Sequence, residues 1–170
     1  MARSAQNVVR HPASVGVAAV RGDGAGRDYQ ELWFALSRRP WRSVVLVPTE
    51  AGASAAAIAT SLSEVGRRLR ETPVTFFVVA DPLDPTSAGR LASQLASGTV
   101  SETPPSADQP LGQVIVAIQP VITEPLGVAI AQAADLAVVC LEMGRSTTAS
   151  VRRTLELLGR DRVAGCVLIR

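Results

Sequence analysis

Residues 134–169, ADLAVVCLEMGRSTTASVRRTLELLGRDRVAGCVLI, carry the clearest structural signal in the chain. Two apolar runs, 136–141 and 163–169, flank a segment in which Val151, Leu155 and Leu158 recur at helical spacing. Both runs are continuously apolar, as are strands that are covered on both faces of a sheet. The stretch therefore predicts a strand, a helix over 147–158 that ends at Gly159, and a second strand, which is the repeating unit of a parallel sheet.

The same alternation continues toward the N-terminus. Strands are predicted over 44–48, 74–80 and 114–118, with helices over 55–70, 86–96 and 126–134 between them. A helix over 28–38 precedes the first of these strands, residues 14–20 favour one more strand, and the Pro-containing stretch 98–110 predicts a loop. We therefore expect an α/β fold, a three-layer sandwich with a mainly parallel sheet. Residues 28–170 form one domain, and residues 1–27 either add one strand or are partly disordered.

The composition narrows the function classes. A chain of 170 residues with 47% hydrophobic residues is long enough to bury the core of one domain. The net charge is only +2 and the basic residues are scattered, which argues against a nucleic-acid partner. No stretch approaches the roughly 20 apolar residues of a membrane span, and the N-terminus lacks the apolar run of a signal peptide. We expect a cytoplasmic protein without direct membrane insertion.

The few residues that bind metals most readily lie far apart in this sequence. The single histidine and the two cysteines show no ligand spacing, so we expect neither a metal site nor a cofactor. Cys140 and Cys166 each fall inside an apolar run, which predicts buried, reduced thiols. A disulfide between them is the less favoured alternative.

Several ordered strings together resemble one family. These are VVLVPTEAGASAAAIA, a strand that ends in Ala-Asp within FFVVADPLDP, then VIVAIQPV, ADLAVVCLEMGRST and the closing GCVLI. In this order they resemble the bacterial tyrosine kinases of exopolysaccharide export and, more broadly, the MinD/ParA-like P-loop ATPases. The resemblance covers residues 29–170 and implies a P-loop-ATPase-like sheet.

The P-loop of that family follows the first of its strands. It uses backbone N–H groups and a Lys to hold the phosphates, and a Ser or Thr hydroxyl to hold magnesium. Matching the strings keeps Gly52 but puts Ala55 at the Lys position and Ala56 at the Ser/Thr position. All 17 basic residues are Arg, so the chain has no Lys to supply from elsewhere.

The acidic positions of the family are also altered. Val79 replaces the first acid of its Asp-x-Asp arrangement and only Asp81 remains, while Ala117 stands where an Asp would end the Walker B strand. Phosphoryl transfer depends on positioned cations. The resemblance therefore implies a degenerate relative that lacks the Walker residues and is not an enzyme.

One candidate ligand site is the crevice at the carboxyl ends of the strands, where open α/β sheets bind ligands. Its candidate residues are Gly52, Ser54, Asp81, Glu142 and Arg145. Each also has a plainer interpretation. Ser54 is suited to starting a helix, Asp81 to a turn beside Pro82, and Glu142 with Arg145 to a solvated loop.

A second candidate site is an interface built on Trp33, Phe34 and Trp41. In helix 28–38, Trp33 belongs to the stripe that covers the sheet, whereas Phe34 lies off that stripe and faces outward. Aromatic residues are favoured anchors of protein interfaces. The alternative is that residues 15–20 fold over these side chains within one subunit.

Two functions remain open. The first is a non-catalytic, ATPase-like scaffold or regulator that binds a protein partner or itself, and the resemblance places it in exopolysaccharide assembly or export beside an inner-membrane polysaccharide-export protein. The second is a domain that binds a ligand or nucleotide in the strand-end crevice without magnesium-dependent hydrolysis.

Overall fold

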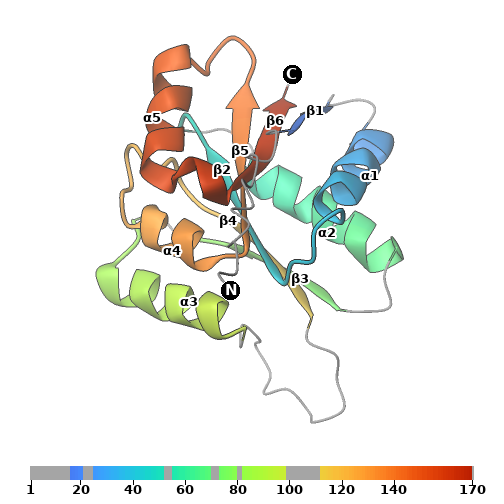
Figure 1. Cartoon of the computed structure of the whole chain (residues 1–170), viewed down its shortest axis with the longest axis horizontal. Coiled ribbons are helices and arrows are strands. Elements are labelled where there is room, and N and C mark those ends of the chain that lie inside the picture. Colours follow the sequence, from blue (N-terminus) through green and yellow to red (C-terminus); the bar gives the residue numbers. More distant parts are fainter. Residues whose placement is uncertain are drawn as a thin grey trace, which may run out of the picture.

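The computed structural model describes residues 16–20, 25–51, 55–69, 73–79, 82–98 and 112–169. Within them the chain alternates strands with helices from end to end, as the apolar runs predicted (Figure 1). The elements are β1 (Gly16–Val20), α1 (Ala25–Leu36), β2 (Ser43–Pro48), α2 (Ala55–Leu69), β3 (Val74–Val78), α3 (Pro85–Ser97), β4 (Gln113–Ala117), α4 (Gly127–Ala133), β5 (Leu136–Glu142), α5 (Thr148–Leu158), a short 3₁₀ turn at Arg160–Arg162 and β6 (Val163–Ile169).

The described strands form one six-stranded sheet in the order β1-β6-β5-β2-β4-β3. Every strand pair in it is parallel. The central strands β2 and β4 are buried along their whole length, which explains why their sequences read as continuous apolar runs. The predicted α/β class and the parallel sheet are confirmed.

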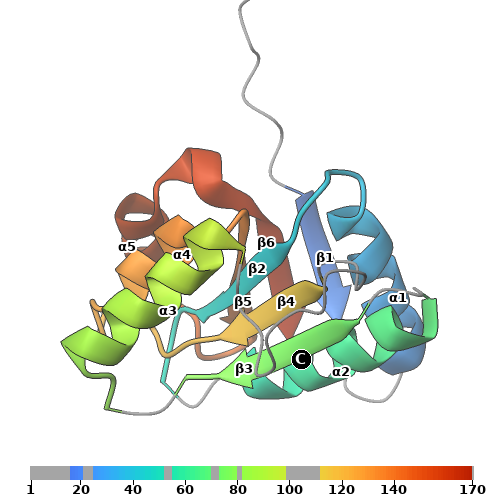
Figure 2. The same ribbon diagram turned by 90° about the horizontal axis from the view of Figure 1, so that it is seen from below.

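Helices cover both faces of the sheet (Figure 2). Alternate side chains of β2 divide between the two layers: Val44 and Leu46 pack with α1 and α2, whereas Val45 and Val47 face the layer of α3, α4 and α5. Each face thereby buries its own apolar cluster. The result is the three-layer sandwich expected from the sequence.

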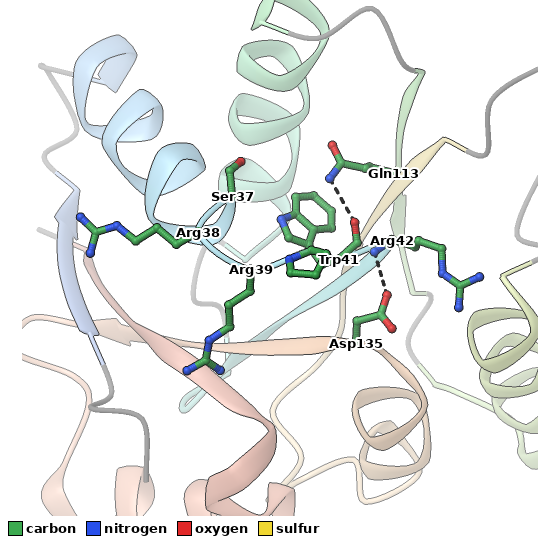
Figure 3. Close-up of a pocket in the computed structure, with 8 residues that line it drawn as sticks. Ser37, Arg38, Arg39, Trp41, Arg42, Gln113 and Asp135 are labelled. Carbon is green, nitrogen blue, oxygen red and sulfur yellow. Dashed lines mark hydrogen bonds between the residues drawn. The ribbon is translucent and has the colours of Figure 1, made fainter. Parts of the chain in front are cut away.

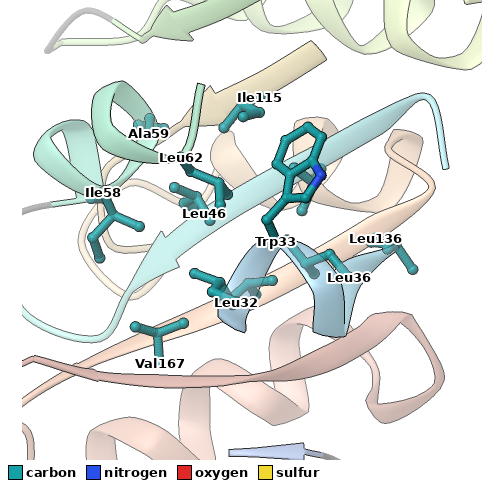
Figure 4. Packing of buried hydrophobic residues seen from close by; sticks show 14 of the residues in the cluster. Leu32, Trp33, Leu36, Leu46, Ile58, Ala59, Leu62, Ile115, Leu136 and Val167 are labelled. Atoms are coloured by element: carbon teal, nitrogen blue, oxygen red, sulfur yellow. The ribbon is translucent and has the colours of Figure 1, made fainter. Parts of the chain in front are cut away.

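The cluster under α1 and α2 has Trp33 at its centre (Figure 4). Trp33 is 1% exposed, and its ring meets that of Trp41 edge to face, with the ring centroids 5.5 Å apart. Trp41 is also buried, at 6% exposure. Both tryptophans are core residues, so their assignment to an interface was wrong. The physical reason is that Trp41, just past α1, turns back under the helix instead of facing out.

Phe34 behaves differently from the two tryptophans. It is 58% exposed, as its place off the apolar stripe predicted. Residues 16–20 pair with β6 at one edge of the sheet, so the expected extra strand exists but leaves Phe34 uncovered. Helix α1 begins at Ala25, three residues before its predicted start at residue 28.

Local capping signals account for the helix ends. The Asp84 carboxylate accepts a hydrogen bond from the Ser87 backbone N–H at 2.9 Å and caps α3. Hydrogen bonds from Ser87, first its side chain and then its backbone, lower the pKa of Asp84 below 3.8. Thr147 and Ser150 form a reciprocal capping box at the start of α5, and Gly159 ends that helix as predicted.

No helix in the part of the chain described here has the length and apolar content needed to cross a bilayer.

Candidate functional site

The carboxyl ends of β2, β4 and β5 meet in the middle of the sheet. After β2 the chain runs to α2 on one face, whereas after β4 and β5 it runs to α4 and α5 on the other face. Where neighbouring connections leave in opposite directions, they separate and open a crevice at the sheet edge. Strand β2 has such a reversal on both sides, so this edge is the topological candidate for ligand binding.

A hydroxyl pair ties the loop after β2 to the loop after β5. The hydroxyl oxygens of Thr49 and Ser146 lie 2.7 Å apart, and the Thr49 backbone N–H donates to the carbonyl of Cys140 at 3.2 Å. Ser146 Oγ also accepts from the Glu142 backbone N–H at 2.7 Å. Thr49 is 2% exposed, so this hydroxyl pair forms a buried contact between the two loops.

A guanidinium bridges the same two loops nearer the surface. Arg145 Nη2 donates to the carbonyl oxygen of Ala51 at 3.0 Å, and Nη1 pairs with the Glu142 carboxylate at 3.4 Å. Gly144, between these two residues, has φ +79°, a left-handed conformation that favours glycine and allows the tight turn. The structure thus places Glu142 and Arg145 side by side at the carboxyl edge of the sheet, and a ligand crevice there stays a prediction.

The other three predicted crevice residues, Gly52, Ser54 and Asp81, lie outside the described residues. Three positions where the resemblance requires a charged side chain, 55, 79 and 117, do lie within the described residues. Ala55 starts α2 at 3% exposure, and Ala117 ends β4 at 2% exposure, both within the cluster that contains Trp33. Val79 follows β3 at 8% exposure and belongs to the cluster on the opposite face.

The described polar groups at this edge come from the loops after β2 and β5. Among the residues described, the loop segments 49–51 and 142–146 offer one guanidinium, two carboxylates (Glu50 and Glu142) and two hydroxyls, and the Glu142 carboxylate already pairs with the guanidinium. The same residues hold no group of three or more His, Cys, Asp or Glu that could ligate a metal ion. A guanidinium in such a place can bind a polar or anionic group.

Sequence reasoning missed a pocket at the opposite edge of the sheet, at the amino ends of β2, β4 and β5. Its lining residues are Ser37, Arg38, Arg39, Pro40, Trp41, Arg42, Gln113 and Asp135. One signal was present, the string SRRPWR over residues 37–42, with three arginines in five positions between a helix and a strand. Gln113 and Asp135 carried no such signal, since only strand pairing brings them beside that string.

No protein-family model matches this sequence, and a search of curated proteins finds no relative. Solved structures do match. The chimerical protein CapA2B2 superposes with a TM-score of 0.63 at 13% identity, over 92% of this chain and 94% of that chain. The kinase domain of the Escherichia coli tyrosine kinase ETK gives a TM-score of 0.58 at 14% identity, over 86% of this chain and 76% of that one.

The BceF tyrosine kinase domain is also similar, with a TM-score of 0.54 at 14% identity, over 85% of this chain and 77% of that chain. At such identities a structural likeness speaks for the fold and not for the chemistry. The chain therefore has the fold of bacterial tyrosine kinase domains, with the P-loop-ATPase-like parallel sheet that the sequence resemblance implied.

Proposed function

We propose that this chain is a non-catalytic, kinase-like domain that acts by binding a protein, as a scaffold or regulator, and does not hydrolyse ATP. The observation that carries the proposal is the packing of Ala55, Val79 and Ala117. Each stands where the resemblance requires a charged side chain, and each is an apolar residue in a buried hydrophobic cluster. A phosphoryl-transfer site needs cations and metal-ordering carboxylates at such places.

The size of the expected loss supports the absence of catalysis. Removing one preorganised charge-stabilising group from an active site lowers turnover by roughly two to three powers of ten. Three positions differ here at once, and the chain has no Lys. Arg145 does not replace the missing Lys in this geometry, because its guanidinium is held by Ala51 and Glu142.

The direct test is phosphate release from ATP with magnesium. We expect the purified chain to release phosphate at the same background rate as its Asp81→Ala variant, which removes the one acid retained in the Asp-x-Asp string. Autophosphorylation with labelled ATP should be absent as well. The proposal is falsified if the wild-type chain releases phosphate clearly faster than this variant.

The alternative function is ligand binding at the carboxyl edge, and the Arg145 guanidinium between two loops is the observation in its favour. A thermal-shift screen with ATP, ADP, GTP and NAD separates the two proposals, since a bound ligand raises the melting temperature by mass action. We expect no shift. A shift that is lost in an Arg145→Ala variant would favour the alternative.

We further infer a cytoplasmic location and a role in exopolysaccharide assembly or export beside an inner-membrane export protein. The resemblance of the ordered strings supports this part of the proposal. Deletion of the chain in its source organism should lower the yield of exopolysaccharide, and an unchanged yield would remove the chain from that pathway.

A further inference from the structure

The pocket at the amino edge of the sheet has a volume of about 620 Å³, within the range of ligand sites. It is formed by the stretch that joins α1 to β2, together with the first residue of β4 and the residue before β5 (Figure 3). It lies at the end of the strands opposite the crevice described above. Neither the resemblance nor the solved structures assign it a role.

Positive charge dominates this pocket. Arg38, Arg39 and Arg42 are exposed, and none of the three forms an ion pair among the described residues. The one acid, Asp135, is occupied, because its Oδ2 accepts from the backbone N–H groups of Arg42 at 2.7 Å and Ser43 at 2.9 Å. Three guanidiniums therefore remain without an anionic partner among the described residues at this end of the sheet, and that of Arg42 lies against Gly98 at the end of α3.

Three residues that line the pocket also carry unpartnered polar atoms, each of them buried beneath the pocket surface. Trp41 is 6% and Gln113 is 9% exposed, yet Trp41 Nε1 and Gln113 Oε1 have no hydrogen-bond partner. The buried Ser37 hydroxyl is unpartnered too, so three of the four such side-chain atoms in the described part of the chain belong to this pocket. Folded proteins leave few buried polar atoms unpaired, and a cluster of them calls for an explanation.

The arrangement of these groups identifies the ligand chemistry. In Figure 3 the guanidiniums of Arg38, Arg39 and Arg42 spread in three directions and do not converge on one point. Such a spread suits several carboxylates spaced along a chain better than one small anion. A peptide amide supplies an acceptor for the Trp41 indole N–H and a donor for Gln113 Oε1.

We propose that the amino-edge pocket binds an acidic polypeptide segment of a partner protein. Carboxylates of the segment pair with Arg38, Arg39 and Arg42, and a main-chain amide satisfies Trp41 and Gln113 after a side-chain rotation at the pocket wall. The inference rests on the protein-binding part of the proposed function and gives the partner its chemistry. It is independent of whether the carboxyl edge hydrolyses ATP.

The test uses fluorescence anisotropy with a labelled ten-residue poly-glutamate peptide as the probe. We expect saturable binding that weakens as salt is raised, since the contacts are charged. The Arg39→Gln/Arg42→Gln double variant should lower the affinity at least tenfold. Its matched control is Arg152→Gln/Arg153→Gln on α5, which removes the same charge from exposed positions elsewhere and should leave the affinity nearly unchanged.

A Trp41→Phe variant tests the hydrogen bond separately, because it keeps an aromatic ring against Trp33 and removes the indole N–H. We expect a severalfold loss of peptide affinity.

The proposal is overturned by the absence of peptide binding, by equal losses in both arginine double variants, or by equal binding of a poly-glutamine peptide. Displacement of the peptide by millimolar inorganic phosphate would also overturn it, since the pocket would then be a small-anion site. A chain that releases phosphate from ATP but binds the peptide as expected would contradict the proposed function alone.

Discussion

Asp135 shows how one side chain fixes the amino end of a central strand. Its Oδ2 accepts from the backbone N–H groups of Arg42 and Ser43, and its own N–H donates to Ser43 Oγ at 3.0 Å. Ninety-two positions separate Ser43 from Asp135, so this reciprocal contact joins the starts of β2 and β5. These hydrogen bonds between Asp135 and residues 42–43 support the register of β2 against β5, in addition to the packing of apolar side chains.

Replacing Asp135 by Ala should lower the free energy of unfolding by about 1–3 kcal/mol, because the part-buried Ser43 N–H loses its acceptor. Asp135→Asn keeps an acceptor oxygen and should cost less. Chemical denaturation of the two variants measures the difference. Equal stability of the Ala variant and the wild type would show that water replaces the carboxylate at no cost.

Cys140 is the most strongly perturbed titrating group described. Burial, and secondarily the charge of Cys166, raise the pKa of the Cys140 thiol to about 12. The two cysteines are free and buried, as the sequence predicted. They pack in the clusters on opposite faces of the sheet, which explains why adjacent strands hold them without a disulfide.

This shift predicts a loss of stability at high pH. The unfolded thiol ionises above about pH 9, while the folded one stays protonated up to about pH 12. Stability from this group is therefore complete below pH 9 and falls by about 1.4 kcal/mol per pH unit as the pH rises from there to the folded pKa. Denaturation between pH 8 and 11 measures the slope. A Cys140→Ala variant should show a shallower slope, and parallel slopes would contradict the assignment.

At the scale of elements, the contact between α1 and α2 depends on a missing side chain. Gly66 lies in the last turn of α2 directly against the Trp33 ring, and a Cβ at this position would overlap ring atoms Cη2 and Cζ3. Trp33 fills the space that the glycine leaves and cannot move within a fully buried cluster. The large residue on α1 and the small one on α2 are thus complementary.

We therefore expect Gly66→Ala to destabilise the chain by about 1–3 kcal/mol through overpacking, in spite of the better helix propensity of Ala. The matched control is Gly89→Ala on α3, where a Cβ meets nothing within 4 Å. That change should stabilise by about 0.5–1 kcal/mol, since only backbone entropy is involved. Thermal melts of both variants measure the effects, and changes of the same sign would refute the packing argument.

At the scale of the whole molecule, Phe34 is a large aromatic side chain exposed on α1. Among the described residues, Phe34 is 58% exposed on α1, and strand β1 pairs with β6 at the sheet edge. The original interface hypothesis is therefore reduced from three aromatic residues to one. Self-association through α1 stays a prediction.

Replacing Phe34 by Ser should lower the assembled mass seen by light scattering and leave far-UV circular dichroism unchanged, because an exposed ring adds little to folding. Ala35→Ser, at the neighbouring exposed position, is the control and should not change the mass. A wild-type chain that stays monomeric at high concentration would end the self-association hypothesis. Unfolding of the Phe34 variant would instead assign the ring to the core.

The sequence by itself determined the order and type of the elements in this protein. Strand and helix signals are local: the continuous apolar runs of β2 and β5, the helical spacing in α5, and caps such as Thr147 and Gly159 are each complete within a few residues. Glu142 and Arg145 were also predictable as neighbours, since they lie three positions apart at the end of a strand. The strand, helix and cap signals arise from side-chain periodicity and backbone conformation, which do not depend on residues far away in the sequence.

Only the tertiary structure decided which residues meet across the sheet. The strand order, the link from Thr49 to Ser146 and the hydrogen bonds from Ser43 to Asp135 join positions more than 90 residues apart. The sequence indicated a surface position for Trp41, but the packing of α1 and α2 buries it. The amino-edge pocket is formed by three chain segments that lie far apart in the sequence. Burial and long-range pairing are properties of the assembled layers, so periodicity within one segment carries no information about them.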